Sequence, residues 1–419
     1  MLARNRVDIG LFLTSFLVLA LGAAAGPARA DWRIETVDSA GNVGVYPSLA
    51  IDADGNPHVA YVDYTNGRLK YAKRVGGTWQ TEVVPGLAGY GTIPSRALDS
   101  QGRPHIAYLG YGLCYTHWTG TEWQSSVVSW SNTVASLALT TTDEPRMAIR
   151  IWGDAGDSLW YVVPSGSSWS WTNVYGSGYG CCGSTPALAL DANDNPRIGW
   201  GYAHYLVYAW SDGSTWPNEV PYQNVDMYSV SMVLDTADQP HVVFDSSQYN
   251  LIYGRRLDSV WSFETVSGAA GTWSRLALDS YDHPHIVYHT GAYNSGPMKY
   301  AHRTTSSWCI QSVDDATSCA NASIGVDPDG NPHIAYQDGT NLDLKYAWWE
   351  PSMVLGDLNC SGCVGFADIN PFVQYLANFS AWQATYPGCD PRNGDINGDG
   401  TDPSFGDINP FVALLSGGG

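Results

Sequence analysis

Charged side chains are scarce in this chain of 419 residues, because Asp, Glu, Lys and Arg together make up only 14% of it. Basic residues are the rarer kind: 20 Lys and Arg stand against 40 Asp and Glu, which leaves a formal net charge of −20. The sequence contains no long run of Lys or Arg. A surface this acidic repels phosphate backbones, so nucleic-acid binding is not expected.

Several signatures of catalysis and metal binding are also missing. The chain has no G-x-S-x-G, no H-E-x-x-H, no glycine-rich phosphate loop and no pair of C-x-x-C zinc knuckles. Serine hydrolase, zinc protease and nucleotide hydrolase functions are therefore unsupported. After the first thirty residues no segment approaches 18 consecutive apolar residues, so no membrane-spanning helix is expected.

Aromatic and turn-forming residues are abundant. The chain holds 18 Trp, 26 Tyr, 45 Gly and 23 Pro, and 44% of its residues are hydrophobic. This composition favours β-strands and turns over helices, and it is ample for a buried core.

The N-terminus has the features of a secretory signal peptide. Arg4 and Arg6 precede an apolar run over residues 11–25, and Ala28 and Ala30 supply the small residues of a cleavage site. The alternative, a membrane anchor, is disfavoured because the run is short for a bilayer. We expect residues 1–30 to be removed and a secreted, extracellular protein to begin at Asp31.

The chain has eight cysteines, which is consistent with export to an oxidising environment where disulfides form. Cys309–Cys319 and Cys360–Cys389 are plausible disulfides, while the adjacent Cys181 and Cys182 could pair only as a vicinal bridge. Sequence alone does not determine the connectivity.

One motif recurs seven times over residues 31–350, for example as SLAIDADGNPHVAY from Ser48 and SIGVDPDGNPHIAY from Ser323. The copies are separated by 41 to 51 residues, measured between aligned prolines: Pro57, Pro104, Pro145, Pro196, Pro240, Pro284 and Pro332. A period of this length is typical of β-propeller blades.

Each repeat predicts four strands, the last of which begins at a tryptophan. The seventh copy lacks this fourth strand, but residues 31–37 match the fourth-strand segment 79–84. The N-terminal segment is therefore expected to complete the last blade and close a ring of seven.

A glycine shortly before the tryptophan marks the hairpin into the fourth strand, as with Gly77 and Trp79 or Gly120 and Trp123. This resembles a degenerate form of the Asp-box turn in sialidase-like and fucose-lectin-like propellers of secreted bacterial proteins. The aspartate of that turn is not in register here, so the resemblance implies the fold and not the activity.

Two sets of repeated polar residues are interpreted as scaffold. Histidines follow the repeat proline at His58, His105, His241, His285 and His333. Because they lie on different blades they cannot converge on one metal ion, and we expect them to bond to neighbouring turns. The repeated aspartates are assigned to turn chemistry: Asp52, Asp99, Asp191, Asp235, Asp279 and Asp327.

The variable loops between blades and between second and third strands share one face of a propeller and are rich in aromatic residues. Aromatic rings stack on the apolar faces of sugars, so these residues are candidate ligand contacts, with packing between blades as the alternative. They are Tyr90, Tyr111, Trp130, Tyr179, Tyr228, Tyr249, Trp273 and Tyr293.

A hydrolytic site is not apparent. Glycoside hydrolysis requires two carboxylates on either side of one bond, and sequence cannot pair the loop aspartates: Asp154, Asp157, Asp226, Asp245, Asp314 and Asp315. A sialidase would need an arginine triad, whereas Arg146 and Arg197 merely replace the repeat histidine.

The last residues, 351–419, carry a different duplication. GDLNCSGCVGFADINPFV from Gly356 is echoed by GDINGDGTDPSFGDINPFV from Gly394. Oxygen-bearing side chains at alternate positions with a glycine at the bend predict a calcium loop. A helix is expected from about Asp368, with an apolar face of Ile369, Phe372, Val373 and Leu376.

This duplicated loop and helix resembles a type I dockerin domain. The resemblance implies calcium as cofactor and a cohesin-like or other protein as partner. It implies one ion at Asp357, Asn359, Ser361, Asp368 and the carbonyl of Cys363, and a second at Asp395, Asn397, Asp399, Asp407 and the carbonyl of Thr401.

Two features depart from that family. The second loop has one extra residue, with Asp402-Pro403 at its centre, which puts its calcium site in doubt. Phe366-Ala367 and Phe405-Gly406 replace the Ser/Thr pairs that dockerins present to cohesins, which puts ordinary cohesin specificity in doubt.

The sequence therefore predicts a mostly β, secreted, non-enzymatic protein: a seven-bladed propeller that recognises carbohydrate or protein, followed by a dockerin-like calcium module. The alternative is a polysaccharide-degrading glycoside hydrolase or lyase tethered through that module. A third hypothesis is an adhesion scaffold that binds no small ligand.

Overall fold

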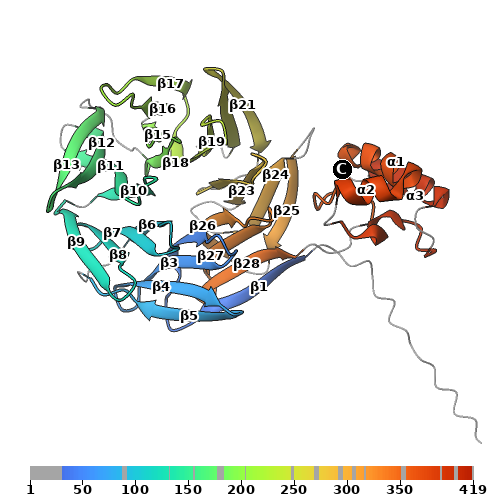
Figure 1. Cartoon of the computed structure of the whole chain (residues 1–419), viewed down its shortest axis with the longest axis horizontal. Helices are drawn as coiled ribbons and strands as arrows, with labels where there is room; N and C mark the ends of the chain where they lie inside the picture. Colours follow the sequence, from blue (N-terminus) through green and yellow to red (C-terminus); the bar gives the residue numbers. More distant parts are fainter. Residues whose placement is uncertain are drawn as a thin grey trace, which may run out of the picture.

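The computed structural model describes residues 31–86, 92–131, 133–153, 156–176, 184–202, 204–246, 250–268, 273–290, 296–303, 308–315, 318–350, 355–386, 389–400 and 404–417. Seven antiparallel sheets of four strands stand in a ring (Figure 1). The predicted seven-bladed propeller is confirmed. A small helical region follows it. The signal-peptide segment, Cys181 and Cys182 lie outside the described residues.

The strands of each blade follow one another outward from the ring centre. Blade 1 is β2 to β5 (Val45–Ile51, Pro57–Asp63, Arg68–Val75, Thr78–Val83) and blade 2 is β6 to β9 (Thr92–Leu98, Pro104–Leu109, Leu113–Trp118, Trp123–Ser129). Blade 3 is β10 to β13 (Val134–Leu139, Pro145–Gly153, Gly156–Ser165, Ser168–Tyr175) and blade 4 is β14 to β17 (Ala187–Leu190, Pro196–Tyr202, Tyr205–Trp210, Asn218–Gln223).

Blade 5 is β18 to β21 (Met227–Leu234, Pro240–Ser246, Leu251–Leu257, Val260–Ser267) and blade 6 is β22 to β25 (Arg275–Leu278, Pro284–His289, Met298–Arg303, Trp308–Asp314). Blade 7 contains β26 to β28 (Cys319–Val326, Pro332–Asp338, Asp343–Glu350) and takes its outer strand from β1 (Asp31–Asp38).

The N-terminal strand closes the ring, as predicted. β1 pairs antiparallel with β28, in a register that runs from Asp31 opposite Glu350 to Asp38 opposite Leu344. The N-terminal strand and the last repeat therefore share one sheet, which leaves no open edge on β28.

An aromatic contact joins every blade to the next. A tyrosine of each third strand contacts a tryptophan in or just before the fourth strand of the following blade, with ring centroids 5.1 to 5.6 Å apart: Tyr71–Trp123, Tyr115–Trp169, Tyr161–Trp216, Tyr208–Trp261, Tyr253–Trp308, Tyr300–Trp32 and Tyr346–Trp79. Such edge-on pairs stabilise beyond the area that they bury. Many of the Trp and Tyr residues thus belong to the scaffold.

The strand order gives the ring two distinct faces. The loop face carries the connections between blades and between second and third strands. The turn face carries the connections between first and second strands and the hairpins between third and fourth strands.

On the turn face, aspartates link neighbouring blades. Asp143, Asp194, Asp238 and Asp282 occupy the left-handed position of their turns, with φ of 58° to 64°, where blades 1, 2 and 7 have glycine. Each carboxylate reaches the turn of the preceding blade. Asp194, for example, accepts hydrogen bonds of 2.8 Å from both the N–H and the hydroxyl of Thr141.

We predict that Asp194→Ala destabilises the propeller by about 2 kcal/mol, because it removes these two bonds and places a Cβ at positive φ without a compensating contact. Asp194→Gly relieves the backbone strain and should cost about half as much. Urea unfolding followed by tryptophan fluorescence would measure both values. Equal free energies of unfolding for the parent and both variants would show that this link between blades does not contribute to stability.

The C-terminal region contains α1 (Ile369–Ala377), α2 (Phe379–Thr385) and α3 (Ile408–Gly417) with short 3-10 turns η1 (Phe366–Asp368), η2 (Pro391–Gly394) and η3 (Phe405–Asp407). Its core contains the buried rings of Phe372, Tyr375, Trp382 and Phe411. The expected apolar face of the first helix is only partly buried. Phe372 is buried in the core. Val373 is exposed, and Tyr375 is buried in its stead.

Two disulfides join described cysteines. Cys360–Cys389 is present as predicted, within the helical region. Cys309 pairs with Cys363 instead of Cys319, so the Cys309–Cys319 assignment was wrong. Cys309 lies near the start of β25, at the turn face, whereas Cys319 begins β26 at the loop face, so the two cysteines lie at opposite faces of the ring. The observed bond ties blade 6 to the helical region.

Candidate functional site

The repeat histidines form identical structural networks in five blades. Nδ1 of each ring is hydrogen-bonded to the third-strand tyrosine hydroxyl of its own blade: His58–Tyr71, His105–Tyr115, His241–Tyr253, His285–Tyr300 and His333–Tyr346. Nε2 of His58 lies 3.0 Å from Oδ2 of Asp52, whose Oδ1 accepts the N–H of Asn56 in the turn. These histidines and aspartates are scaffold, as predicted.

A cavity of about 170 Å³ lies in the central channel, towards the loop face, where the inner strands of all seven blades begin. Four of its lining residues have left-handed backbone conformations, with φ of 50° to 73°: Tyr46, Ile93, Trp273 and Asn321. Bulged or irregular backbone of this kind re-aims side chains and often accompanies functional sites.

The channel is lined mainly by a ring of serines that also joins the blades. The hydroxyl of Ser323 accepts the N–H of Leu49 at 3.0 Å, and Ser95, Ser136 and Ser231 do the same for the next blade. In blade 6 this position holds Arg275. Among the described residues that line the cavity, Arg275 carries the only charged side chain.

Arg275 belongs to a buried group of polar residues. Its guanidinium lies 5.5 Å from the Trp273 ring centre, and Asp245 is its electrostatic partner. Burial raises the pKa of Asp245 and lowers that of His289 to about 4. Within the described residues, Oδ2 of Asp245 and both ring nitrogens of His289 have no hydrogen-bond partner. Unsatisfied buried groups are uncommon in scaffolds and are typical of sites that bind water or ligand.

The structure describes three of the eight predicted loop aromatics fully. Tyr111 and Trp130 are exposed on the loop face of blade 2, whereas Trp273 lines the channel and stands 6.0 Å from Tyr46. Tyr228 lies in β18 and its side chain is not described. The rest lie outside the described residues: Tyr90, Tyr179, Tyr249 and Tyr293.

Exposed aromatic side chains gather on the loop face of blades 1 to 4. Tyr64, Tyr111, Trp130, Trp152 and Tyr205 have exposed fractions of 37% to 76%. Sequence reasoning missed Trp152, Tyr64 and Tyr205, although aligning the repeats could have found them. Tyr64 lies in the connection between the second and third strands of its blade, Trp152 near the end of a second strand and Tyr205 at the start of a third. On the turn face of the described propeller, only Tyr281 is comparable.

The loop aspartates considered for catalysis are engaged by neighbours. Asp157 pairs with Arg150, Asp226 with His204, Asp315 with Lys299, and Asp314 accepts from Tyr336. Asp245 accepts from Ser229 and Ser274. Asp154 lies outside the described residues. Such pairing is typical of structural carboxylates.

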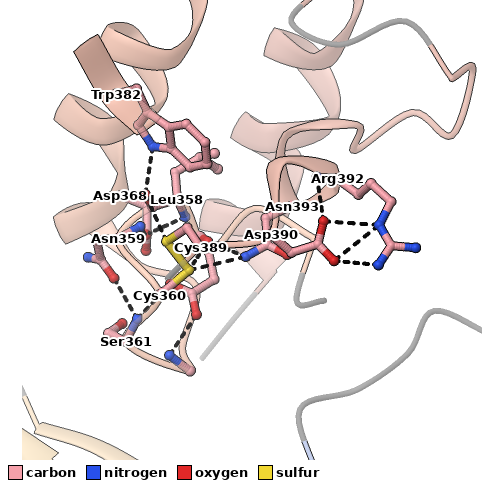
Figure 2. The surroundings of a disulfide bond; sticks show 12 residues. Leu358, Asn359, Cys360, Ser361, Asp368, Trp382, Cys389, Asp390, Arg392 and Asn393 are labelled. Atoms are coloured by element: carbon pink, nitrogen blue, oxygen red, sulfur yellow. Dashed lines mark hydrogen bonds and ion pairs between the residues drawn. A yellow bond between two sulfur atoms is a disulfide. The ribbon is translucent and has the colours of Figure 1, made fainter. Parts of the chain in front are cut away.

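In the first predicted calcium loop, backbone N–H groups donate hydrogen bonds to the two carboxylates of the same loop. Oδ1 and Oδ2 of Asp357 accept the N–H groups of Ser361 and Gly362 at 3.0 and 2.6 Å, and Asp368 accepts those of Leu358, Asn359 and Gly365. Figure 2 shows the Cys360–Cys389 disulfide beside this loop, with the Trp382 indole donating to the Leu358 carbonyl at 2.8 Å.

The second loop repeats this pattern. Asp395 accepts the N–H groups of Asp399 and Gly400 at 3.0 Å, and Asp407 accepts that of Asn397 at 2.9 Å. Alignment of the two copies places the extra residue of this loop within residues 401–403. These residues, which include the predicted ligand Thr401, lie outside the described residues.

The first loop fits a divalent cation. Asp357 and Asp368 are almost fully buried. Burial raises the pKa of both, and the neighbouring Asp368 carboxylate raises that of Asp357 further. No ion pair joins either carboxylate to a basic side chain of the described chain. A cation would neutralise them, with the oxygens of Asn359, Ser361 and Cys363 completing the shell.

The second loop fits less well. In the described part of the chain, no three His, Cys, Asp or Glu side chains gather into a group that could hold a metal ion. The three carboxylates of this loop, at Asp395, Asp399 and Asp407, therefore do not converge, which agrees with the doubt raised by its extra residue.

Among the described residues no helix is long and apolar enough to cross a membrane. No protein-family model matches the chain, and no curated protein matches it in sequence.

Solved structures match the propeller in fold. An ulvan lyase, a polysaccharide lyase, has a TM-score of 0.53 at 12% identity over 74% of this chain and 95% of its own. A streptogramin B lyase has a TM-score of 0.52 at 11% identity over 76% and 98%. The NanB sialidase of Streptococcus pneumoniae has a TM-score of 0.42 at 13% identity over 75% and 69%. At these identities the likeness concerns the fold alone, which is a seven-bladed β-propeller.

Proposed function

We propose that this chain is a secreted carbohydrate-binding protein whose propeller holds a glycan on its loop face. The C-terminal region is a dockerin-like calcium module that attaches the propeller to a partner protein. The observation that carries the binding proposal is the concentration of exposed aromatic side chains on the loop face of blades 1 to 4.

Chemistry favours a sugar as the ligand of that face. Tryptophan and tyrosine rings offer flat apolar surfaces to sugar C–H groups, and their N–H and hydroxyl groups bond to sugar hydroxyls. Trp152 adds a cation–π contact, because the Arg150 guanidinium lies 5.5 Å from its ring centre. This contact holds the ring in place while leaving 76% of the residue exposed.

Binding is favoured over hydrolysis because glycoside hydrolysis needs two carboxylates on either side of one bond, and most of the described loop aspartates are engaged by neighbours: Asp157, Asp226, Asp314 and Asp315. Asp245, whose Oδ2 has no described partner, therefore has no second uncommitted carboxylate among them.

The docking proposal rests on a duplicated apolar surface of the helical region. Phe366 and Phe405 hold equivalent positions in the two copies and are 75% and 79% exposed. Three further residues widen this surface: Ile369, Val373 and Val412. Large exposed apolar side chains of this kind mark protein interfaces. A partner that recognises phenylalanine is expected, in place of one that recognises a Ser/Thr pair.

We predict that Trp152→Ala and Trp130→Ala each weaken glycan binding at least about tenfold. An aromatic side chain that the bound ligand covers contributes more than about 1.4 kcal/mol to the binding free energy. The mature chain would be screened on a polysaccharide array, and its best ligand titrated by affinity electrophoresis.

Leu257→Ala is the matched control, because Leu257 is an exposed apolar residue of a turn-face hairpin. It should bind like the parent protein. The proposal fails if no polysaccharide binds, or if the tryptophan variants bind unchanged. Release of reducing or unsaturated sugars during incubation would instead identify an enzyme.

A further inference from the structure

A second and larger cavity lies away from the loop face. It is a cleft of about 860 Å³ between the turn face of blades 5 to 7 and the helical region, which lies beside β24, β25 and β28 (Figure 1). Ligand pockets typically measure about 300–1,000 Å³, so this cleft can hold a small molecule of two or three sugar units.

Covalent and polar contacts hold the two walls together. The Cys309–Cys363 disulfide attaches the first calcium loop to β25. Nε2 of Gln311, two residues further along this strand, donates to the Gly362 carbonyl at 3.1 Å. A side chain at Gly362 would come within 2.9 Å of Trp349, so the loop backbone rests directly on the propeller. The cleft is therefore a fixed feature of the fold.

Aromatic residues line the cleft from both sides. Tyr281, which is 79% exposed, projects from the turn of blade 6, and its ring lies 6.1 Å from the His283 ring. Trp349 lies at the junction, and Tyr386 comes from the end of α2 on the opposite wall. Flat rings on facing walls suit a ligand with two apolar faces.

The polar groups of the cleft are mostly neutralised. Asp279 bonds to His283 at 3.0 Å, Asp282 accepts from Thr236, and Arg303 pairs with Glu264. Arg255 and Asp329 also line the cleft, carry opposite charges and form no ion pair with a described residue. A strongly charged ligand would thus find no excess of opposite charge.

Uncommitted hydrogen-bonding groups line the cleft near the calcium loop. The His302 ring lies beside the backbone of Ser361, but neither of its nitrogens makes a well-formed hydrogen bond to a described residue. Because Nε2 of Gln311 is used by Gly362, its Oε1 remains an acceptor without a described partner. These atoms are buried, so a ligand in the cleft does not reach them. Arg255 and Asp329 are exposed in the cleft instead, and a guanidinium that donates together with a carboxylate that accepts matches hydroxyl groups, which do both.

From this geometry we propose that the cleft is a second carbohydrate site, specific for a neutral oligosaccharide of two or three units. Tyr281 and Tyr386 stack on its faces, and Arg255 and Asp329 bond its hydroxyl groups. This site is separate from the loop face and does not depend on the function proposed for it.

The test uses the mature full-length chain and a panel of neutral trisaccharides: cellotriose, xylotriose, mannotriose and laminaritriose. Isothermal titration should detect one of them. Tyr281→Ala and Tyr386→Ala, which alter the two walls separately, should each weaken its affinity by at least about tenfold. Trp152→Ala, on the loop face, should leave this affinity unchanged.

The proposal is overturned if no trisaccharide binds with a Kd below about 1 mM, or if both tyrosine variants bind like the parent. Binding that is lost in Trp152→Ala but kept in the tyrosine variants would also overturn it, while supporting the loop-face site. Conversely, cleft binding together with unchanged polysaccharide binding by Trp152→Ala would remove only the loop-face proposal.

Discussion

Deletion of residues 31–38 is expected to abolish stable folding of the propeller. Without β1, the edge of β28 loses its hydrogen-bonded partner, and Trp32 no longer contacts Tyr300 of blade 6 or Trp349 of blade 7 at centroid distances of 5.1 and 5.5 Å. The ring then has no covalent or ladder connection across its last interface. The loss should exceed about 5 kcal/mol, which is comparable with the whole stability of many domains. Thermal unfolding and size-exclusion chromatography would reveal a lowered Tm or aggregation.

A smaller change separates ring closure from general damage. Trp32→Ala and Trp79→Ala remove equivalent aromatic contacts. Trp32 of β1 contacts Tyr300 of blade 6, and Trp79 of blade 1 contacts Tyr346 of blade 7. Both should cost about 3–5 kcal/mol, as is usual for a large buried aromatic side chain. If Trp32→Ala were harmless while Trp79→Ala was not, β1 would not be an integral part of the last blade.

Asp357→Ala should remove one calcium-binding event and loosen the helical region. This carboxylate accepts two backbone hydrogen bonds that shape the loop, and it faces Asp368 in a buried site. Without it, the remaining oxygens supply one negative charge instead of two, which is too weak a set for a tight calcium site. Isothermal titration with calcium gives the stoichiometry, and circular dichroism during thermal unfolding gives the stability of the helices.

Asp390→Ala is the matched control for this experiment. Asp390 lies in the same region, but it pairs with the exposed Arg392 and with the N–H of the same residue (Figure 2). Its loss should leave the calcium stoichiometry unchanged. Unchanged stoichiometry in Asp357→Ala as well would refute the assignment of the first loop.

The repeated elements could be predicted almost completely. A strand pattern that recurs with one proline per copy fixes both the number of blades and their turns, because these depend on residues close together in the sequence. The closing strand was also predictable, since the segment at Trp32 matches the one at Trp79. The structural role of the histidines followed from their distribution over different blades.

The residues that differ between repeats were predicted less well. Tyr111 and Trp273 looked equivalent as loop aromatics, yet the first is exposed and the second lines the channel. Val373 was expected to be buried but is exposed, because the two halves of the helical region pack through Phe372 and Phe411, whose centroids are 4.2 Å apart. Exposure depends on neighbours that are distant in the sequence.

Basic residues are scarce in the sequence, and most described arginines form ion pairs with nearby acidic side chains. Arg275 differs from these in lining the central channel. The sequence by itself determined the propeller, its closure and the two loop–helix copies, because local patterns specify them. Only the tertiary structure decided the Cys309–Cys363 bond, the aromatic surface of blades 1 to 4 and the cleft beside the first predicted calcium loop. Each of these depends on which strand ends and loops from remote repeats meet in space, and no local pattern encodes that.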